Sequence, residues 1–600
     1  RLAMRCGVDT GGTFTDVVGD DGTVTKVLST PDDPSRAVSE GLGPRRVDEA
    51  RPDLQAHGTT VATNALLERQ GAVVALVTNE GFADVIEIAR QDRPALYDQH
   101  ADRPEPLVPR ELRLEVGGRL DAAGEEIAPV DVDAVPEVPD GVEAVAVCLL
   151  HADLEPAHER AVAGVLAERG LDVTCSSDVS PEFREYERTV TTVLNAYLRP
   201  RCRSYLRELA ALAGEVLVMT SAGGLVPAAE AADLPVSLLL SGPAGGVVAG
   251  AAAAAAGGFA DAVTFDMGGT STDVCLVQGG MPEPAPGRVA GGFPVRLPAL
   301  DIHTIGAGGG SIASIDPGGA LVVGPRSAGA DPGPACYGRG GTLPTVTDAD
   351  LVLGRIPADG SFPGLGRLDV DAARAALAAA GVAAEGVVTV VDAAMERAVR
   401  RVTVERGVDP TGLALVAFGG AGPLHACAVA AALGMEAVVV PPRAGVLSAV
   451  GLLCSPRQRD LVRSWPTPGD HDGLANALAT LADEAAAAVG GDPGDVTVTT
   501  AVDCRYAGQS HELTVESVDD FPDEHRRRNG YARPGAPVEV VALRARARRP
   551  PPLTVDDLPP ATERRAATGP CVMAEPDCTV WIPEGWSANV AEDGSWVVTR

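Results

Sequence analysis

Short runs of hydrophobic residues alternate along this chain with longer amphipathic segments. AVVALVT from Ala72 and VEAVAVCLL from Val142 are strand-like runs, whereas GFADVIEIAR at 81–90 and AHERAVAGVLAERG at 157–170 have helical spacing. Apolar runs bounded by turn residues favour buried strands, and apolar positions three and four residues apart favour helices. Because the two kinds of segment alternate, the pattern predicts an α/β fold.

Two distant segments share one sequence pattern. DTGGTFTDVV from Asp9 and DMGGTSTDVC from Asp266 are identical at seven of ten positions. An apolar strand precedes each glycine pair and a second strand follows it, so each copy is predicted to form a β-hairpin with a glycine-rich tip. In the first copy a third strand, TVTKVL at 23–28, continues the meander. A repeat at this distance predicts duplicated domains and not a solenoid.

The patterning also divides the chain. Residues 182–213 predict a long helix, interrupted at Pro200, that connects two lobes. After about residue 455 short alternating strands such as DVTVTTAVDCRY predict a separate β-rich region. We therefore expect an N-terminal lobe at 4–181, the helical connection with a second lobe at 182–455, and a β-rich C-terminal domain at 456–600.

The chain is acidic, with 82 acidic against 49 basic side chains and a formal net charge of −33. Such a charge repels a phosphate backbone, which argues against nucleic acid as a partner. Lys26 is the single lysine, and it follows Thr25 in a strand-like run, which excludes a phosphate loop ending in Gly-Lys-Ser/Thr. A small anionic ligand must then be held by backbone amides or by a metal.

The cysteines and the longest uncharged run indicate the cellular setting. The eleven cysteines form no C-x-x-C pair and lie mostly in apolar stretches, which favours buried thiols in a reducing cytoplasm. Residues 234–260 carry no charge but are dominated by alanine and glycine and contain Ser241-Gly242-Pro243. This composition favours a buried loop and helix over a membrane span, so we expect a cytoplasmic protein without a membrane partner.

The two hairpins have the residues that a phosphate site needs. Glycines let backbone N–H groups approach an anion, and hydroxyl groups donate further hydrogen bonds. Asp9 and Asp266 end the first strands and suit Mg²⁺, because hard cations prefer carboxylate oxygens. A tight turn of ordinary turn formers is the alternative, and it explains two matched copies less well than one. The candidate phosphate ligands are Gly11, Gly12, Thr13, Thr15, Gly268, Gly269, Thr270, Ser271 and Thr272, and the candidate catalytic carboxylates are Asp9, Asp16, Asp266 and Asp273.

A third glycine-rich segment follows the strand-like run LALVAF. It consists of Gly419, Gly420, Ala421 and Gly422, and the next residue, Pro423, suits the first turn of a helix. Glycines permit close approach of an adenine or ribose, so this segment is predicted to bind the adenosine part of a nucleotide. An ordinary strand-to-helix turn is the alternative.

Polar residues elsewhere are candidates for the same cleft. His57, which opens HGTTVATNALLER, is expected to face the cleft as a catalytic residue. Asp301 and His303 would share one face of a strand, either as a tentative metal pair or as a hydrogen-bonded pair that orients the next loop. Arg326, in GPRSAGADPGPACYG, is the candidate for stabilising phosphate charge, with a surface arginine as the alternative. Cys336 is expected to be a structural thiol.

These motifs together resemble a known family. Two hairpins with an adenosine loop are similar to the two-lobed ATPase fold of actin, sugar kinases and heat-shock ATPases. The wider set of motifs resembles the hydantoinase A/oxoprolinase family and runs in order from residue 7 to about 425, with weaker similarity in DCRYAGQSHELTV and GPCVMAEPDCTVWIPEGW. The motifs are GVDTGGTFTDVV, HGTTVATNALLER, DRPALYD, SGPAGGVVAGA, FDMGGTSTDV, DIHTIGAGGGSIA, SAGADPGPACYG, VTDADLVLGR and AFGGAGPLHA.

The resemblance implies an ATP- and Mg²⁺-dependent hydrolase subunit that opens a cyclic amide or imide of the hydantoin or oxoproline type. It also implies a hetero-oligomer with a B-type subunit, because the A-type signatures occupy almost the whole chain. Two alternatives stay open: the ATP-using subunit of a ketone carboxylase of the acetone or acetophenone type, and a non-enzymatic actin-like nucleotide switch. The family's usual length exceeds this chain's, and sequence at 519–570 is compressed.

Overall fold

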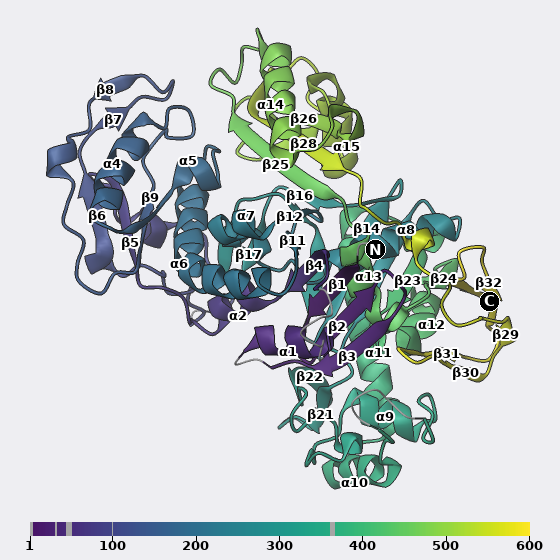
Figure 1. The fold of residues 1–600 in the computed structure, drawn as a ribbon. Helices are drawn as coiled ribbons and strands as arrows, with labels where there is room; N and C mark the ends of the chain where they lie inside the picture. Colours follow the sequence, from purple (N-terminus) through teal and green to yellow (C-terminus); the bar gives the residue numbers. More distant parts are fainter. Residues whose placement is uncertain (1–3, 31–32, 44–50, 99, 361–365) are drawn as a thin grey trace.

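The computed structural model describes residues 4–30, 33–43, 51–98, 100–360 and 366–600. Within these residues, a ten-stranded and a nine-stranded mixed sheet form the centre of the molecule, and a four-stranded sheet lies to one side (Figure 1). Helices pack between and around the sheets, so the predicted α/β class is confirmed.

The first glycine-rich segment forms the predicted meander. Strand β1 (Arg5–Thr10) pairs antiparallel with β2 (Phe14–Gly19), which pairs antiparallel with β3 (Val24–Leu28). On its other side β1 runs parallel to β4 (Leu54–Thr59). The meander lies at one edge of the ten-stranded sheet, with β3 as the outermost strand.

The second segment repeats this arrangement in the nine-stranded sheet. Strand β13 (Ala262–Met267) pairs antiparallel with β14 (Thr272–Gln278), and β14 pairs antiparallel with β20 (Ile302–Ile305). On its other side β13 runs parallel to β23 (Ala414–Phe418), which leads through the third glycine-rich segment into α12 (Gly422–Leu433). The two hairpins therefore occupy equivalent places in two sheets.

Two helices pack between these sheets. Buried side chains of α8 (Ala244–Ala256) and α13 (Leu447–Leu453) share one hydrophobic cluster with residues of β4 and β14, one strand from each sheet. The helices cross so closely that a Cβ on Gly451 would lie 1.9 Å from the carbonyl oxygen of Gly245. Only glycine permits this approach, so the crossing fixes the two hairpin-bearing sheets relative to each other.

The helical predictions need two corrections. Helix α6 (Glu185–Ala210) runs without a break through Pro200. Proline removes one backbone hydrogen bond, but buried side chains on both sides of Pro200, such as Leu198 and Cys202, hold the helix in place. The expected helix at 81–90 is reduced to α3 (Val85–Ile88), whereas α4 (Ala157–Glu168) forms as predicted.

The strands of the C-terminal region are shared between the two large sheets. Strands β25 (Arg457–Ser464), β26 (Thr497–Tyr506) and β28 (Val538–Arg549) extend the ten-stranded sheet through pairing of β25 with β12 (Leu225–Pro227). Strand β33 (Trp596–Thr599) instead pairs with β24 (Ala437–Val440) in the nine-stranded sheet. The region is β-rich as expected, but most of its strands join the two large sheets, and β30 (Cys571–Ala574) pairs with β31 (Thr579–Ile582) in a small sheet. The three domain boundaries stay a prediction.

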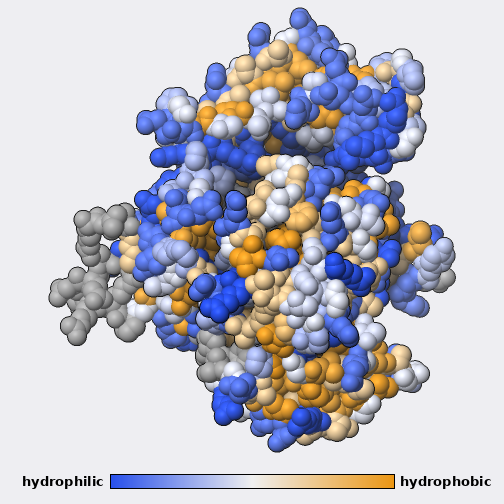
Figure 2. Space-filling view, turned by 90° about the vertical axis from the view of Figure 1, so that its right-hand side faces the viewer, coloured by the Kyte–Doolittle hydropathy of each residue, from blue (hydrophilic) through white to orange (hydrophobic). Residues whose placement is uncertain are grey.

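Two features of the fold concern hydrophobic residues: a patch on the surface and the apolar helices. Figure 2 shows hydrophobic residues gathered at the lower end of one face, the height at which Figure 1 draws α9 (Val346–Val352) and the alanine-rich α10 (Val370–Ala380). In the described parts of the chain no single helix is long and apolar enough to cross a bilayer, although α10 together with residues 384–406 passes that test as a pair bent by 82°.

Candidate functional site

The tips of both hairpins open into one cavity of about 400 Å³. The tips also lie close together, because a Cβ on Gly269 would be 3.6 Å from the Thr13 hydroxyl oxygen. The third glycine-rich segment lines the same cavity, as predicted. The predicted residues that line it are Asp9, Gly11, Gly12, Thr13, Asp16, Asp266, Gly268, Gly269, Thr270, Ser271, Asp273, Gly419, Gly420 and Ala421.

Strand register places the carboxylates in matching rows. Asp9 on β1 is directly opposite Asp16 on β2, and Asp266 on β13 is directly opposite Asp273 on β14. Because directly opposed residues of paired strands share one face of a sheet, each hairpin presents two carboxylates to the cavity. The duplicated sequence thus produces a duplicated acidic row.

Each first-strand aspartate lies against a glycine. A Cβ on Gly58 would lie 3.0 Å from Oδ1 of Asp9, and a Cβ on Gly419 would lie 2.3 Å from Oδ1 of Asp266. Gly419 also has φ +77°, a backbone conformation that side-chain-bearing residues rarely adopt. Glycine at these positions leaves space for the two carboxylates.

Burial disfavours the charged form of these carboxylates. Burial first, and then the neighbouring Asp273 and Asp9, raises the pKa of Asp266 from 3.8 to about 8. Burial and Asp16 raise the pKa of Asp9 to about 7, with Lys26 acting in the opposite direction. Burial also raises the pKa of Asp273 to about 6 and that of Asp16 above its ordinary value. These carboxylates offer several oxygen donors with little positive charge around them, which suits a hard divalent cation such as Mg²⁺.

Lys26 is a cavity residue that the sequence did not indicate. It lies on β3 directly opposite Asp16, and its Nζ is 2.7 Å from Asp16 Oδ1 and 5.0 Å from the centre of the Phe14 ring. The sequence excluded Lys26 from one known phosphate loop, but the alternation of TVTKVL could have placed it on the face of the hairpin that carries Asp16.

A glycine-rich loop supports the second hairpin. The N–H groups of Gly309 and Gly310 donate to the carbonyl oxygens of Gly268 and Gly269 over 2.9 and 2.7 Å. A Cβ on Gly308 would lie 2.7 Å from the Gly268 oxygen, so side chains would push the loop off the hairpin tip. The run TIGAGGGS therefore acts at the site through backbone contacts.

One end of the cavity is apolar. Tyr337, Ile356, Leu368 and Leu424 line it, together with the carboxylate of Asp350 on α9. Asp350 is 1% exposed, and its Oδ1, which accepts no hydrogen bond, lies 3.6 Å from Nη1 of Arg355. An apolar wall with a buried acceptor suits a flat, partly apolar group that carries a hydrogen-bond donor.

A buried histidine holds Asp350 from behind. Nε2 of His425 is 3.1 Å from Asp350 Oδ2, and its Nδ1 is 2.7 Å from Asp392 Oδ1. Burial lowers the pKa of His425, but Asp350 and Asp392 outweigh burial and raise it to about 10. A charged imidazolium between two carboxylates therefore fixes the orientation of Asp350. The sequence analysis did not identify this group, because its three members lie in three separate segments.

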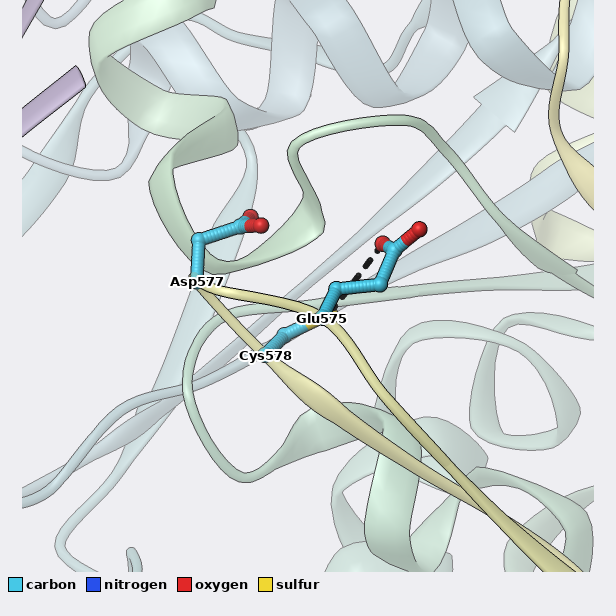
Figure 3. A group of neighbouring side chains, drawn as sticks. All are labelled: Glu575, Asp577 and Cys578. Atoms are coloured by element: carbon cyan, nitrogen blue, oxygen red, sulfur yellow. Dashed lines mark hydrogen bonds between the residues drawn. The ribbon is translucent and has the colours of Figure 1, made fainter. Parts of the chain in front are cut away.

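The C-terminal region also reaches the cavity. Glu575, Asp577 and Cys578 lie between β30 (Cys571–Ala574) and β31 (Thr579–Ile582), and their ligand atoms fall within 4.8 Å of one another (Figure 3). Arg564 donates to both carboxylate oxygens of Glu575 over 2.8 and 2.6 Å, and burial raises the pKa of the Cys578 thiol. Both features disfavour a metal here. Asp577 instead accepts a hydrogen bond from the N–H of Gly445, which lies in the short helical turn just before α13.

Three predicted ligands are absent from the cavity lining. The Thr15 hydroxyl lies 3.1 Å from the Ser29 hydroxyl oxygen, and the Thr272 hydroxyl donates to the Ala307 carbonyl, so both brace the hairpins from within. Gly422 is buried in the first turn of α12.

His57 does not face the cleft. It is fully buried, with Nε2 2.8 Å from the Tyr205 hydroxyl, and burial lowers its pKa to about 3. Strand β4 alternates, so the residue after His57, Gly58, faces Asp9 while His57 faces the helix α6. The histidine is therefore a neutral member of a buried polar network.

The remaining predicted residues also lie outside the cavity. Arg326 is exposed on β22 (Leu321–Ser327). Asp301 forms an ion pair with Arg406, and burial with Arg401 and Arg406 lowers the pKa of His303. In the part of the chain that the structure describes, neither joins a group of three potential metal ligands, so the tentative metal pair is not supported.

Several known proteins are similar to this chain in sequence and in fold. Residues 188–460 match the family described as hydantoinase/oxoprolinase, and residues 5–170 match its N-terminal region. The caprolactamase subunit alpha of Pseudomonas jessenii is 35% identical over 100% of this chain and 99% of its own. The acetophenone carboxylase gamma subunit of Aromatoleum aromaticum is 36% identical over 74% of this chain and 67% of its own.

Two further comparisons concern structure and length. The crystal structure of the ATP-dependent caprolactamase from Pseudomonas jessenii superposes with a TM-score of 0.85 at 32% identity, covering 99% of both chains. The 5-oxoprolinase 1 of Arabidopsis thaliana is 35% identical over 75% of this chain, but the match spans 41% of that protein.

Proposed function

Because the chain belongs to the hydantoinase/oxoprolinase family, we propose that it is the ATP-using subunit of an enzyme that opens a cyclic amide or imide. The observation that carries this proposal is the pair of matched hairpins, whose aspartates Asp9 and Asp266 face one cavity. Two equivalent glycine-rich tips on either side of one space suit the phosphates of a single nucleotide.

The two hairpin-bearing sheets then form the two lobes of an actin-like ATPase fold. The phosphates lie at the tips, near Gly12, Thr13, Gly269 and Thr270, and the adenosine extends past Gly419 and Gly420. The apolar end of the cavity receives the base, with Asp350 Oδ1 as an acceptor for a donor group of the nucleoside. Oδ1 accepts no hydrogen bond within the chain, so a donor group of a bound nucleoside would satisfy it.

The chemistry follows from the poor reactivity of an amide. The amide oxygen attacks the γ-phosphorus and ADP leaves, which makes the ring carbon electrophilic. Water then adds to that carbon, the C–N bond breaks with its electron pair and a proton going to nitrogen, and a second water hydrolyses the acyl phosphate. The protein's part in the first step is positioning and charge neutralisation.

The carboxylates supply the oxygen ligands that this step needs. Asp9 and Asp266, with Asp16 and Asp273 behind them, would hold Mg²⁺, which neutralises phosphate charge when bound. Hairpin amides and hydroxyls orient the phosphates, and the loop at 308–310 keeps the second hairpin in position.

A ketone carboxylase subunit is the second candidate. The likeness to the acetophenone carboxylase gamma subunit favours it, at 36% identity over 74% of this chain, against 35% over 100% for the caprolactamase subunit alpha. The two candidates differ in the co-substrate, because carboxylation consumes bicarbonate and ring opening consumes water.

A B-type partner subunit completes the proposed enzyme. The alpha-subunit relative is matched over nearly its whole length, whereas the match to 5-oxoprolinase 1 spans less than half of that protein. The second half of the reaction would then take place on another polypeptide, which finishes the activated amide.

The test measures ATP use by the chain alone and with its partner against cyclic amides, cyclic imides, and ketones with bicarbonate. We expect ADP release that depends on a cyclic amide or imide and ring-opened product only with the partner. ATP use that requires a ketone and bicarbonate would favour the second candidate, and ring opening at full rate by the chain alone would contradict the two-subunit proposal.

A further inference from the structure

Almost all basic side chains of this protein are arginines. Of its 49 lysine and arginine residues, Lys26 alone is a lysine. That lysine lines the cavity, and the lining residues in the described part of the chain include no arginine. The one amine-bearing side chain is therefore also the one cationic side chain at the cavity wall.

The charge balance of the cavity makes this cation necessary. Seven acidic side chains line it, namely Asp9, Asp16, Asp266, Asp273, Asp350, Glu575 and Asp577. Glu575 and Asp350 have basic partners behind the wall, in Arg564 and His425. The hairpin carboxylates have only Lys26 as a cationic partner among the described residues, and a triphosphate adds further negative charge to the same space.

The two hairpins differ at this position. Asp16 on the first hairpin is directly opposite Lys26 on β3, whereas Asp273 on the second is directly opposite Thr304 on β20. The same three-strand arrangement thus carries an ammonium group in one copy and a hydroxyl in the other. This difference adds to that between Phe14 and Ser271 at the hairpin tips, so the two ends of a bound phosphate chain meet different groups.

We propose that Lys26 binds an oxygen of the phosphoryl group that the enzyme transfers, and that Asp16 holds its amine in position. This inference rests on the proposed ATP-using function. Lys26 lies at the phosphate end of the cavity, because it lines the cavity beside the first hairpin and is paired with Asp16. The transferred phosphoryl group carries negative charge on its equatorial oxygens in the transition state, so an ammonium beside one of them stabilises that state.

The chemistry of the ammonium group explains why arginine does not occupy this place. An ammonium is a compact point charge on a flexible stem and can contact a carboxylate and a phosphate oxygen at once. A guanidinium is a wide planar group, and elsewhere in this chain it forms a cross-strand ion pair with an aspartate. In the same sheet, Arg546 on β28 is directly opposite Asp460 on the neighbouring strand β25. Its Nε lies 2.6 Å from Asp460 Oδ1, and both side chains are about as little exposed as those of Lys26 and Asp16. A purely structural pair at Asp16 would accept arginine equally well.

The single lysine permits a direct test by amine labelling. The chain is acetylated with an N-hydroxysuccinimide ester, and the rate at Lys26 is followed by peptide mass spectrometry with and without Mg²⁺-bound non-hydrolysable ATP. We expect nucleotide to slow the reaction about tenfold or more at concentrations well above its dissociation constant. Arg546→Lys supplies a second amine in a matched pair outside the cavity, and nucleotide should leave its labelling rate unchanged.

Variants separate a phosphate contact from a structural pair. Lys26→Met and Arg546→Met each remove one cross-strand ion pair, so we expect similar small changes in the melting temperature of the nucleotide-free chain. With the partner subunit present, Lys26→Met should lower kcat for ATP use about a hundredfold, and Arg546→Met should not. Lys26→Arg should keep the melting temperature but recover only part of kcat, because its fork cannot take the ammonium's position.

The outcomes distinguish this inference from the function on which it rests. If the wild-type chain binds no nucleotide by calorimetry, the proposed function fails and the inference with it. If nucleotide binds but Lys26 is labelled at the same rate, or Lys26→Arg has full kcat, the role of Lys26 is structural and the inference alone is overturned.

Discussion

Replacing Asp266 by asparagine should make the nucleotide-free protein more stable while abolishing its ATP use. The pKa of Asp266 is raised from 3.8 to about 8, because burial first, and then Asp273 and Asp9, disfavour its charged form. Asparagine has nearly the same shape and carries no charge, so it removes that penalty. It also removes an oxygen ligand from the proposed cation site.

The magnitude and the pH window follow from the shift. At about 1.4 kcal/mol per pKa unit, ionised Asp266 would cost on the order of 6 kcal/mol if it were sealed from solvent. The carboxyl opens to the cavity, so we expect about 1–3 kcal/mol. The unfolded chain releases this proton near pH 3.8 and the folded chain near pH 8, so wild type loses stability as the pH rises through that window. The advantage of Asp266→Asn should grow from pH 4 to pH 8 and then stay constant.

The assay is thermal unfolding from pH 5 to pH 9 in the presence of EDTA, with ATP turnover measured on the same preparations. Asp503→Asn is the matched control. Asp503 is also buried, but Arg544 overcomes burial and lowers its pKa, so asparagine there should destabilise the protein at every pH in this range. An Asp266→Asn variant that melts below wild type at pH 8, or that retains full ATP turnover, would refute the reasoning.

Three further variants test other parts of the structure. Gly451→Ala should destabilise the protein by about 1–3 kcal/mol or more, because its Cβ would lie 1.9 Å from the Gly245 oxygen; an unchanged melting temperature would contradict the close helix crossing. His425→Gln should destabilise most below pH 6.5 and progressively less as the pH rises toward 10, because the raised pKa of His425 adds stability only while the imidazole is protonated; a pH-independent difference in melting temperature would refute that charge state. Asp350→Asn should weaken binding of ADP by calorimetry but not binding of pyrophosphate, and equal effects on both would remove Asp350 from the nucleoside end.

The duplicated motifs allowed much of the site to be predicted. Strand, glycine pair and strand recur around Asp9 and Asp266, and local turn chemistry suffices to make each a hairpin. Both hairpins and the segment at 419–421 do line one cavity, as the matched pattern indicated. Local sequence carries this information because glycine conformations and strand alternation are decided within a few residues.

Predictions for isolated residues were less successful. His57 lies just before a strand-to-helix turn, but the sequence pattern does not reveal which face of β4 meets the cavity. In the structure His57 packs against Tyr205. Arg326 was expected in a cleft-lining loop but is exposed on β22, and the carboxylate of Asp301 forms an ion pair with Arg406. The partners of His57 and Asp301 come from other segments of the chain, so motif spacing could not reveal them.

The sequence by itself determined the α/β class, the duplicated hairpins, the glycine turns and the family, because these depend on local pattern and on short-range conformational preference. Only the tertiary structure decided how the C-terminal strands are shared between two sheets, and that Asp350 is held by His425. It also decided that Lys26 is the cation of the cavity wall. These features depend on contacts between residues far apart in the chain, and burial and charge become specific only once those residues are brought together.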